Sequence, residues 1–274
     1  MPVDLDRSST TALVEVALSV GFEEFHRMLR YELDDLWDQK YAEQFPTDEE
    51  KAPHKPFIED PDGGLVALPS ASPITNIRRW FSSEDGAGLV QVQRNWFARN
   101  WRATLESTSN GAVTPYPGYA SVRSDFAESL QGFIDFVGDT DLGEFKPLQC
   151  EISYRFQLRA EGLWDGPGGL DRVARMFSAD RGSYLPDLEA MRIITQYAMV
   201  DEAGKRRGRL YGRLETGAAE DGSHFLILTM FARGTPDGHC PEDVYAFQDE
   251  GQRWIVNGLR EFLTPEALAW YNLG

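Results

Sequence analysis

Cysteine and histidine are scarce in this sequence. The 274 residues include two cysteines and four histidines, and neither Cys150 nor Cys240 belongs to a C-x-x-C pair. This pattern excludes a disulfide framework and provides no zinc or redox motif. The spacing Glu23-x-x-His26 is found in carboxylate-bridged di-iron sites, but such a site needs a second matching motif, which the sequence lacks. We therefore expect neither a metal nor a cofactor.

Positive charge is also in deficit. Lysine and arginine together number 27, against 44 aspartates and glutamates, which gives a net charge of −17 and a pI near 4.6. Non-specific attraction to DNA, RNA or anionic lipid needs a basic surface, so this balance disfavours those partners. An acidic surface is typical of a solvated protein, and it is also what a protein with a basic partner, or a mimic of nucleic-acid charge, would present.

Long apolar runs are missing as well. The longest, FLILTMFA from Phe225, is far shorter than the roughly 20 residues that a membrane-spanning helix requires. The first ten residues, MPVDLDRSST, lack the basic and apolar regions of a signal peptide. We expect a cytoplasmic protein without a membrane segment.

The motifs of familiar enzyme classes are absent too. The sequence has no G-x-S-x-G elbow, no P-loop and no H-E-x-x-H motif, and GPGG at residues 166–169 does not fit a dinucleotide fingerprint. An acid–base site built from Glu151, Tyr154 and Arg155 stays open. Strand geometry places Tyr154 on the opposite face from the other two, which favours ordinary pairing on the strand surface. Enzymatic activity is left undecided, with the missing motifs favouring a protein that is not an enzyme.

What the sequence does contain is a clear succession of strand and helix patterns. Apolar residues alternate with a period of two in expected strands and recur at spacings of three and four in expected helices. The expected strands are 12–23, a hairpin of 77–81 with 89–97, 146–159, and a meander of 191–200, 209–215 and 225–232. The expected helices are 22–45, 119–137 and 243–263, with a short one after Thr264-Pro265. Six prolines predict a long irregular connection over residues 46–73.

This order of elements predicts an α+β fold. It has too few strand–helix alternations for a doubly wound parallel sheet, so we expect one or two curved antiparallel sheets covered on one side by three main helices. A first half, residues 1–160, would carry strand, helix, hairpin, helix and strand. A second half, residues 161–274, would carry the meander and the last helix, packed with the first as one compact unit. A pseudo-duplication of the halves stays open, because no repeat of identical residues demonstrates it.

Polar side chains gather on the sheet face that points away from the helices. Alternation in the strands places ten of them there: Gln91, Gln93, Glu151, Ser153, Arg155, Gln157, Arg159, Gln196, Arg209 and Arg213. A solvated sheet face is the ordinary explanation for such a pattern. The alternative is a groove for a small polar or anionic ligand, because arginine suits carboxylate and phosphate. The ligand-binding candidates are Glu151, Arg155, Arg213, Gln91 and Gln93.

The stretch QVQRNWFARNWR, residues 91–102, combines aromatic and basic residues. Such a mixture is typical of either a nucleic-acid contact or a strand end that packs beneath a helix. With a net charge of −17 around it, the stretch favours core and turn. Trp96, Phe97 and Trp101 are then expected to be buried anchors, and Asn100 to satisfy backbone groups in the turn.

Several segments, in order, carry a resemblance to a known family. They are VEVALSVGFE, the Phe45-Pro46 pair, VQVQRNWFARNWR, YPGYASVRSDF, LGEFKPLQCEISY and a last helix that ends near Trp270. The chain resembles, over nearly its whole length, a sporadically distributed family of bacterial proteins. It departs from that family at Gln252, where a histidine after Asp249 is expected, and this puts any catalytic role of the position in doubt.

The resemblance implies a bacterial, cytoplasmic protein but no reaction, because the family has no established activity. A sporadic distribution is typical of components of mobile gene systems. Together with the missing catalytic motifs, it leads us to expect a non-enzymatic binding or interaction component with a protein partner. The alternative is a small-molecule-binding protein or an enzyme that uses a pocket between the polar sheet face and residues 46–73.

Overall fold

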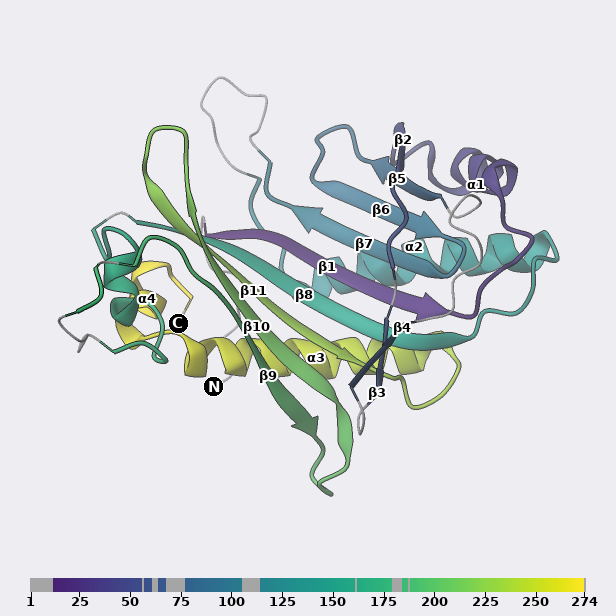
Figure 1. Cartoon of the computed structure of the whole chain (residues 1–274). Coiled ribbons are helices and arrows are strands. Elements are labelled where there is room, and N and C mark those ends of the chain that lie inside the picture. The colour runs from purple at the N-terminus through teal and green to yellow at the C-terminus, as the bar shows by residue number, and fades with distance from the viewer. Residues whose placement is uncertain are drawn as a thin grey trace.

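The computed structural model describes residues 12–55, 57–60, 64–67, 77–104, 114–160, 162–178, 184–186 and 188–273. Nine strands form one open antiparallel sheet in the order β2-β5-β6-β7-β1-β8-β11-β10-β9 (Figure 1). Their bounds are β1 Leu13–Phe22, β2 Thr47–Lys51, β5 Arg78–Ser82, β6 Gly88–Gln93, β7 Trp96–Arg102, β8 Pro147–Arg159, β9 Arg192–Val200, β10 Arg206–Ala218 and β11 His224–Gly234. A separate hairpin joins β3, Phe57–Asp60, to β4, Gly64–Ala67. The α+β prediction with an antiparallel sheet is therefore confirmed.

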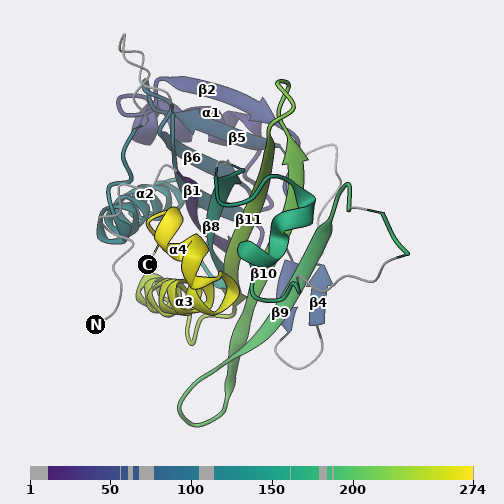
Figure 2. The ribbon, with the colours of Figure 1, turned by 90° about the vertical axis from the view of Figure 1, so that its left-hand side faces the viewer.

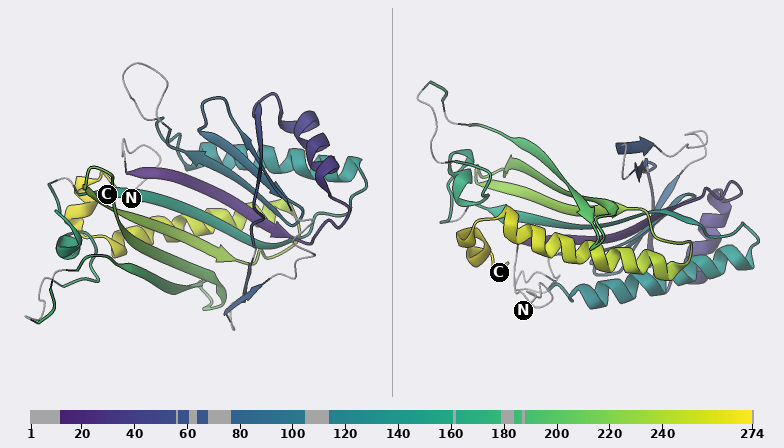
Figure 3. Two further views of the ribbon diagram at one scale, coloured as in Figure 1. Left: turned by 45° about the horizontal axis from the view of Figure 1, so that its top comes forward. Right: turned by 90° about the horizontal axis from the view of Figure 1, so that it is seen from below.

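Two long helices lie against one face of the sheet. They are α2, Tyr119–Asp139, and α3, Pro241–Phe262, while the β3–β4 hairpin lies on the opposite side (Figure 3). The shorter helical segments are α1 Arg30–Leu36, the π-helical turn η2 Trp37–Tyr41, the 3₁₀ segment η3 Pro167–Arg172 and α4 Pro265–Trp270. In the described part of the chain, none of these helices combines the length and the apolar character needed to cross a bilayer.

The core lies between the sheet and the two long helices. β1 and β8 pair at the centre of the sheet, with Val16 opposite Tyr154 and Val20 opposite Cys150. All four side chains are fully buried, as are those of Phe126 and other residues of the facing helices. The period-two alternation of β8 predicted this inner face, because successive strand residues point to opposite sides.

The same connectivity occurs on each side of the central β1–β8 pair. β1 leads through α1 and η2 to the outer strands, returns through β7 beside β1, and continues into α2. β8 leads through η3 to the outer strand β9, returns through β10 to β11 beside β8, and continues into α3. By this connectivity the second half begins with β8. The boundary predicted from the sequence lies after β8, at residue 160.

Three local predictions need correction. The helix expected over 22–45 begins only at Arg30, because the backbone N–H groups of Phe22 and Phe25 donate to carbonyls of the β6–β7 turn at 3.2 and 2.9 Å. The strand expected over 89–97 reverses after Gln93, and β7 is a strand of its own. The connection expected to be irregular over 46–73 contains the edge strand β2 and the β3–β4 hairpin.

Candidate functional site

The two glutamine candidates lie on the polar sheet face but are not exposed. Gln91 and Gln93 are 6% and 0% exposed, so the expectation that they face solvent is wrong. Gln91 Nε2 donates to Asn100 Oδ1 at 2.9 Å. The amide of Gln93 accepts from the N–H of His54 at 2.8 Å and donates to its carbonyl at 3.0 Å. The segment that follows β2 thus covers this part of the face and satisfies the Gln93 amide.

The three charged candidates are also not brought together in one pocket. Glu151 accepts a hydrogen bond from Arg233 Nε at 2.6 Å, whereas Arg213 Nη2 donates to Glu215 at 2.8 Å. Arg155 is exposed. The pKa of Glu215 is lowered mainly by the hydrogen bond from Arg213, and the charge of Arg155 adds only a minor part to this effect. The ligand-binding role of these residues stays a prediction.

The β3 strand lies on the polar face, over β8, β11 and β10. Glu59 is fully buried there, and its carboxylate is paired with Arg209 and accepts a hydrogen bond from the Tyr211 hydroxyl at 2.6 Å. Beside it lies a cavity of only about 20 Å³, lined in part by His54 and Glu151. That volume holds about one water molecule. The described part of residues 46–73 therefore fills the space in which a ligand pocket was expected.

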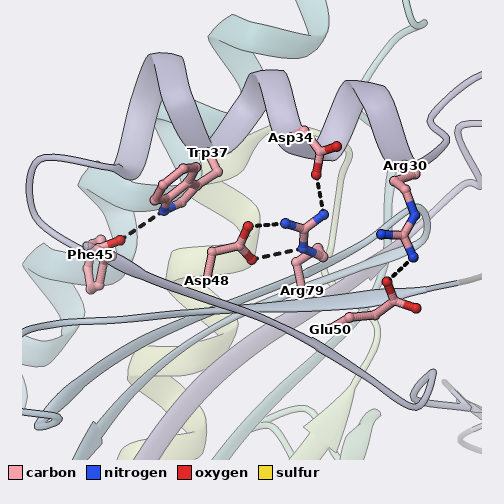
Figure 4. A network of polar contacts seen from close by, with 7 residues as sticks. All are labelled: Arg30, Asp34, Trp37, Phe45, Asp48, Glu50 and Arg79. Atoms are coloured by element: carbon pink, nitrogen blue, oxygen red, sulfur yellow. Dashed lines mark hydrogen bonds and ion pairs between the residues drawn. The ribbon is translucent and has the colours of Figure 1, made fainter.

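On the helix-covered face, α1 and η2 cover the outer strands of the first half. Figure 4 shows the guanidinium of Arg79, on β5, between the carboxylates of Asp34 on α1 and Asp48 on β2. Arg79 Nε donates to Asp48 at 2.8 Å. At the end of η2, Tyr41 stacks on Phe81 of β5, with ring centroids 5.5 Å apart. The short helix is thus fixed to the outer strands by both ion pairs and aromatic packing.

Contacts between η2 and α2 fix the short helical segment to the long helix of the first half. The Tyr41 hydroxyl donates to the Ser129 carbonyl of α2 at 2.6 Å. Trp37 Nε1 donates to the Phe45 carbonyl at 2.9 Å (Figure 4). Leu33 and Leu36 of α1 are buried at 1% and 0% exposure. The apolar side chains of α1 and η2 thus cover the outer strand β5, where Phe81 is fully buried.

The corresponding space of the second half is a groove of about 980 Å³. It lies between α3 and the outer strands β9 and β10. Its lining comprises Tyr197, Val200, Asp201, Glu202, Leu210, Glu250, Arg253, Trp254, Asn257, Gly258, Arg260, Glu261 and Phe262. In this half the counterpart of α1 is η3, which packs instead at the end of α3, where Thr264 Oγ1 donates to the Arg172 carbonyl at 2.6 Å. In the residues just after η3, the Arg175 N–H donates to the Phe262 carbonyl at 3.0 Å, and Ala174 bridges to Leu263. Figure 2 shows η3 and α4 together at that end.

The position of α3 explains why the groove exists. Gly258 brings the helix close to β10, because a Cβ atom there would lie 2.7 Å from Leu210 Cδ2. α3 contacts β8, β11 and β10, and β9 extends beyond it as the edge of the sheet. As a result Tyr197 and Val200 are 47% and 43% exposed, although Met199 is fully buried. The groove has an apolar floor and walls.

The rim of the groove is acidic. Asp201, Glu202, Glu250 and Glu261 contribute four carboxylates, against two guanidinium groups from arginines. One carboxylate, that of Glu250, is within 3.5 Å of Arg207, outside the groove. This imbalance lowers the electrostatic potential over the apolar floor and favours a cationic partner.

The sequence patterns described above do not predict this groove. The signal was present in β9, where Ile193, Ile194, Tyr197, Met199 and Val200 give apolar residues on both faces. Such a strand normally lies in the middle of a sheet, whereas β9 is at the edge. An edge strand with apolar residues on both faces is the pattern that indicates a contact surface.

Comparison of the chain with models of protein families, with curated proteins and with solved structures gave no match. The resemblance to the sporadically distributed bacterial family therefore stays a prediction. Among the described residues, no group of three or more histidine, cysteine, aspartate or glutamate side chains is placed to hold a metal ion.

Proposed function

We propose that this protein is a non-enzymatic interaction module that binds an amphipathic, basic α-helix of a partner protein in the groove between α3 and β9. The observation that carries the proposal is the groove itself, about 980 Å³ in volume, apolar at its base and acidic at its rim. Grooves of this kind receive the apolar face of a helix, with anchors that recur every three or four residues.

The first half of the chain supports a helix as the occupant. There the space between a long helix and the outer strands is filled by α1 and η2, from Arg30 to Tyr41. The second half has the same order of strands and the same long helix, but its connecting segment packs elsewhere. A helix supplied by a partner would give the second half the covering that the first half carries within its own chain.

The charges around the groove support a basic helix. The four carboxylates of the rim would meet lysine or arginine side chains that flank the apolar stripe of the partner. Arg260 Nη2 is shielded from solvent and has no hydrogen-bond partner among the described residues. The last carbonyls of a helix, which lack partners within it, are suitable acceptors for that donor. This favours a helix whose carboxyl end lies near Arg260.

Binding of a designed peptide tests the proposal. The probe is an 18-residue amphipathic helix of leucine and lysine, about five turns long, and its control has every lysine replaced by glutamate. Isothermal titration should show saturable binding of the lysine peptide and none of the glutamate peptide. Equal binding of the two peptides, or no binding of either, would contradict the proposal.

Two matched variants locate the site. Val200→Asp places a carboxylate on the groove wall, and we expect it to weaken lysine-peptide binding by about tenfold or more, because binding must then desolvate an unpaired charge. Ile194→Asp places the same charge farther along β9, outside the groove lining, where Ile194 is 56% exposed, and should leave binding unchanged. Equal losses in the two variants would reject the groove as the site.

A second copy of this chain is the competing occupant. Sedimentation analysis at the concentrations used for titration distinguishes the two cases. A monomer that binds the peptide supports the proposal. A dimer that Val200→Asp dissociates would show that the groove is a self-association surface and would overturn it.

A further inference from the structure

Arg99 occupies a position at which the fold otherwise places apolar side chains. It lies on β7 between Phe97 and Trp101, and its neighbours across the sheet are Leu18 and Val90. These four neighbours are between 0% and 7% exposed. A charged residue on the core face of a central strand is unusual, because burial of a charge carries a large desolvation penalty. Its presence requires an explanation that packing does not give.

The guanidinium of Arg99 is only partly compensated. Its side chain is 13% exposed, and its nearest carboxylate, Asp125 on α2, is 3.8 Å away. One terminal nitrogen donates to the Asn100 carbonyl at 2.5 Å, and the group lies over the Phe45 ring at 5.0 Å. Nε is buried and has no hydrogen-bond partner among the described residues. The group therefore retains donor capacity that the described part of the chain does not use.

A cavity of about 410 Å³ lies at this guanidinium. Arg99, Trp101, Asp125, Glu128, Thr114 and Gly88 are among the residues that line it. Trp101 is 7% exposed, and its indole Nε1, like Arg99 Nε, is buried and lacks a hydrogen-bond partner within the described residues. Gly88 leaves room for the arginine head, because a Cβ atom there would lie 3.1 Å from Nη2. Two unused donors and a volume in the range of small-molecule pockets make this a site for a molecule with acceptor atoms.

The carboxylates of the same cavity restrict the class of molecule. A simple anion would meet Arg99 favourably but would be repelled by Asp125 and Glu128. Burial already raises the pKa of Asp125, an effect that Arg99 opposes and Glu128 adds to. A molecule with both a carboxylate and an ammonium group satisfies the two sets of charges together.

We propose that this cavity binds a free α-amino acid, with its carboxylate on the Arg99 guanidinium and the Trp101 indole N–H and its ammonium group on Asp125. This site is independent of the groove beside α3, which lies in the other half of the chain. The guanidinium and indole donors are suited to a carboxylate, since hydrogen bonds to charged groups are about twice as strong as those between neutral groups.

Thermal shift measurements on the full chain, with the standard L-amino acids added one at a time, test the proposal. We expect at least one to raise the melting temperature in a concentration-dependent way. The deaminated and the decarboxylated analogues of that amino acid should each bind about tenfold more weakly or worse, because each lacks one of the two charges. Failure of every amino acid to raise the melting temperature, or equal binding of either analogue, would overturn the proposal.

Two variants assign the contact atoms. Trp101→Phe keeps a six-membered aromatic ring and removes the five-membered ring that carries the indole N–H. Arg99→Met removes the charge but keeps a long side chain, and each variant should weaken amino-acid binding by about tenfold or more. Arg155→Met, on the exposed opposite face of the sheet, is the control and should bind as the unmodified chain does. If Trp101→Phe folds with an unchanged melting temperature and retains full affinity, the indole has no role in binding and the proposal is wrong.

Discussion

Replacement of Glu59 by glutamine should lower the free energy of unfolding by about 2–3 kcal/mol. The carboxylate is 0% exposed, and the side chain of Arg209 that it pairs with is 14% exposed. Removal of one partner from a buried pair typically costs about 3–5 kcal/mol, because the other charge is left uncompensated. Glutamine keeps an acceptor for the Tyr211 hydroxyl, and local release of β3 would let water reach Arg209, so we expect a loss below that range.

Equilibrium urea unfolding, followed by tryptophan fluorescence, measures this loss. The matched control is Glu266→Gln, which breaks the exposed pair with Arg172, whose side chains are 55% and 48% exposed. Surface pairs of this kind contribute at most about 1 kcal/mol. If Glu59→Gln changes stability no more than the control does, the buried pair does not hold β3 on the sheet and our account of the polar face is incorrect.

Three further predictions concern buried aromatic and titratable groups. Trp101→Ala should destabilise the fold by about 3 kcal/mol or more, whereas Trp270→Ala, at a site 52% exposed, should have little effect; similar melting temperatures for the two would contradict the packing. Burial lowers the pKa of His54 below 6.5, so the unfolded chain binds the proton more readily and stability should fall as the pH drops below about 6.5; a His54→Gln variant with the same pH dependence would refute this. Burial, followed by the hydrogen bond to Asp249, raises the pKa of Tyr119, so its contribution to stability should be lost as the pH rises above about 10; Tyr119→Phe should reduce that alkaline loss, and an unchanged profile would refute the assignment.

Regular alternation and helical spacing predicted the central elements of the fold. The inner face of β8 and the helices α2 and α3 follow directly from the pattern of apolar residues, because these elements are buried along one face. The meander of β9, β10 and β11 was also predicted, and its three strands are consecutive neighbours in the sheet. The spacing of apolar residues was sufficient to predict these elements, because each of them buries one face.

The turn between β6 and β7 was not predictable from local sequence. A two-residue hairpin turn usually contains glycine, but Arg94 and Asn95 form this one, and neither has a positive φ angle. One local contact helps to hold the turn, because Asn95 Oδ1 accepts from Gln93 at 2.6 Å. The other contacts come from distant residues, because the backbone carbonyls of the turn accept from Phe22 and Phe25. These contacts also make the expected start of the first helix a bend and a turn.

The sequence predicted only part of the candidate sites. Of the stretch 91–102, the expectation of buried anchors is confirmed for Phe97 and Trp101, which are 0% and 7% exposed. The expected strand ended at residue 97, so Arg99 was not assigned to a strand. Because β7 continues to Arg102, Arg99 lies on the same strand face as these two aromatic residues and between them. The groove depends on where η3 and α3 pack relative to β9, which no local pattern specifies.

Hydrogen–deuterium exchange with and without the leucine–lysine peptide tests the interaction module most directly. If the groove receives the helix, exchange should slow at residues 197–202 and along the face of α3 from Glu250 to Phe262, which line it. Exchange in α1, β2 and β5 should be unchanged, because that half is already covered by its own chain. Protection confined to the first half or to the polar sheet face, with none beside α3, would contradict the account.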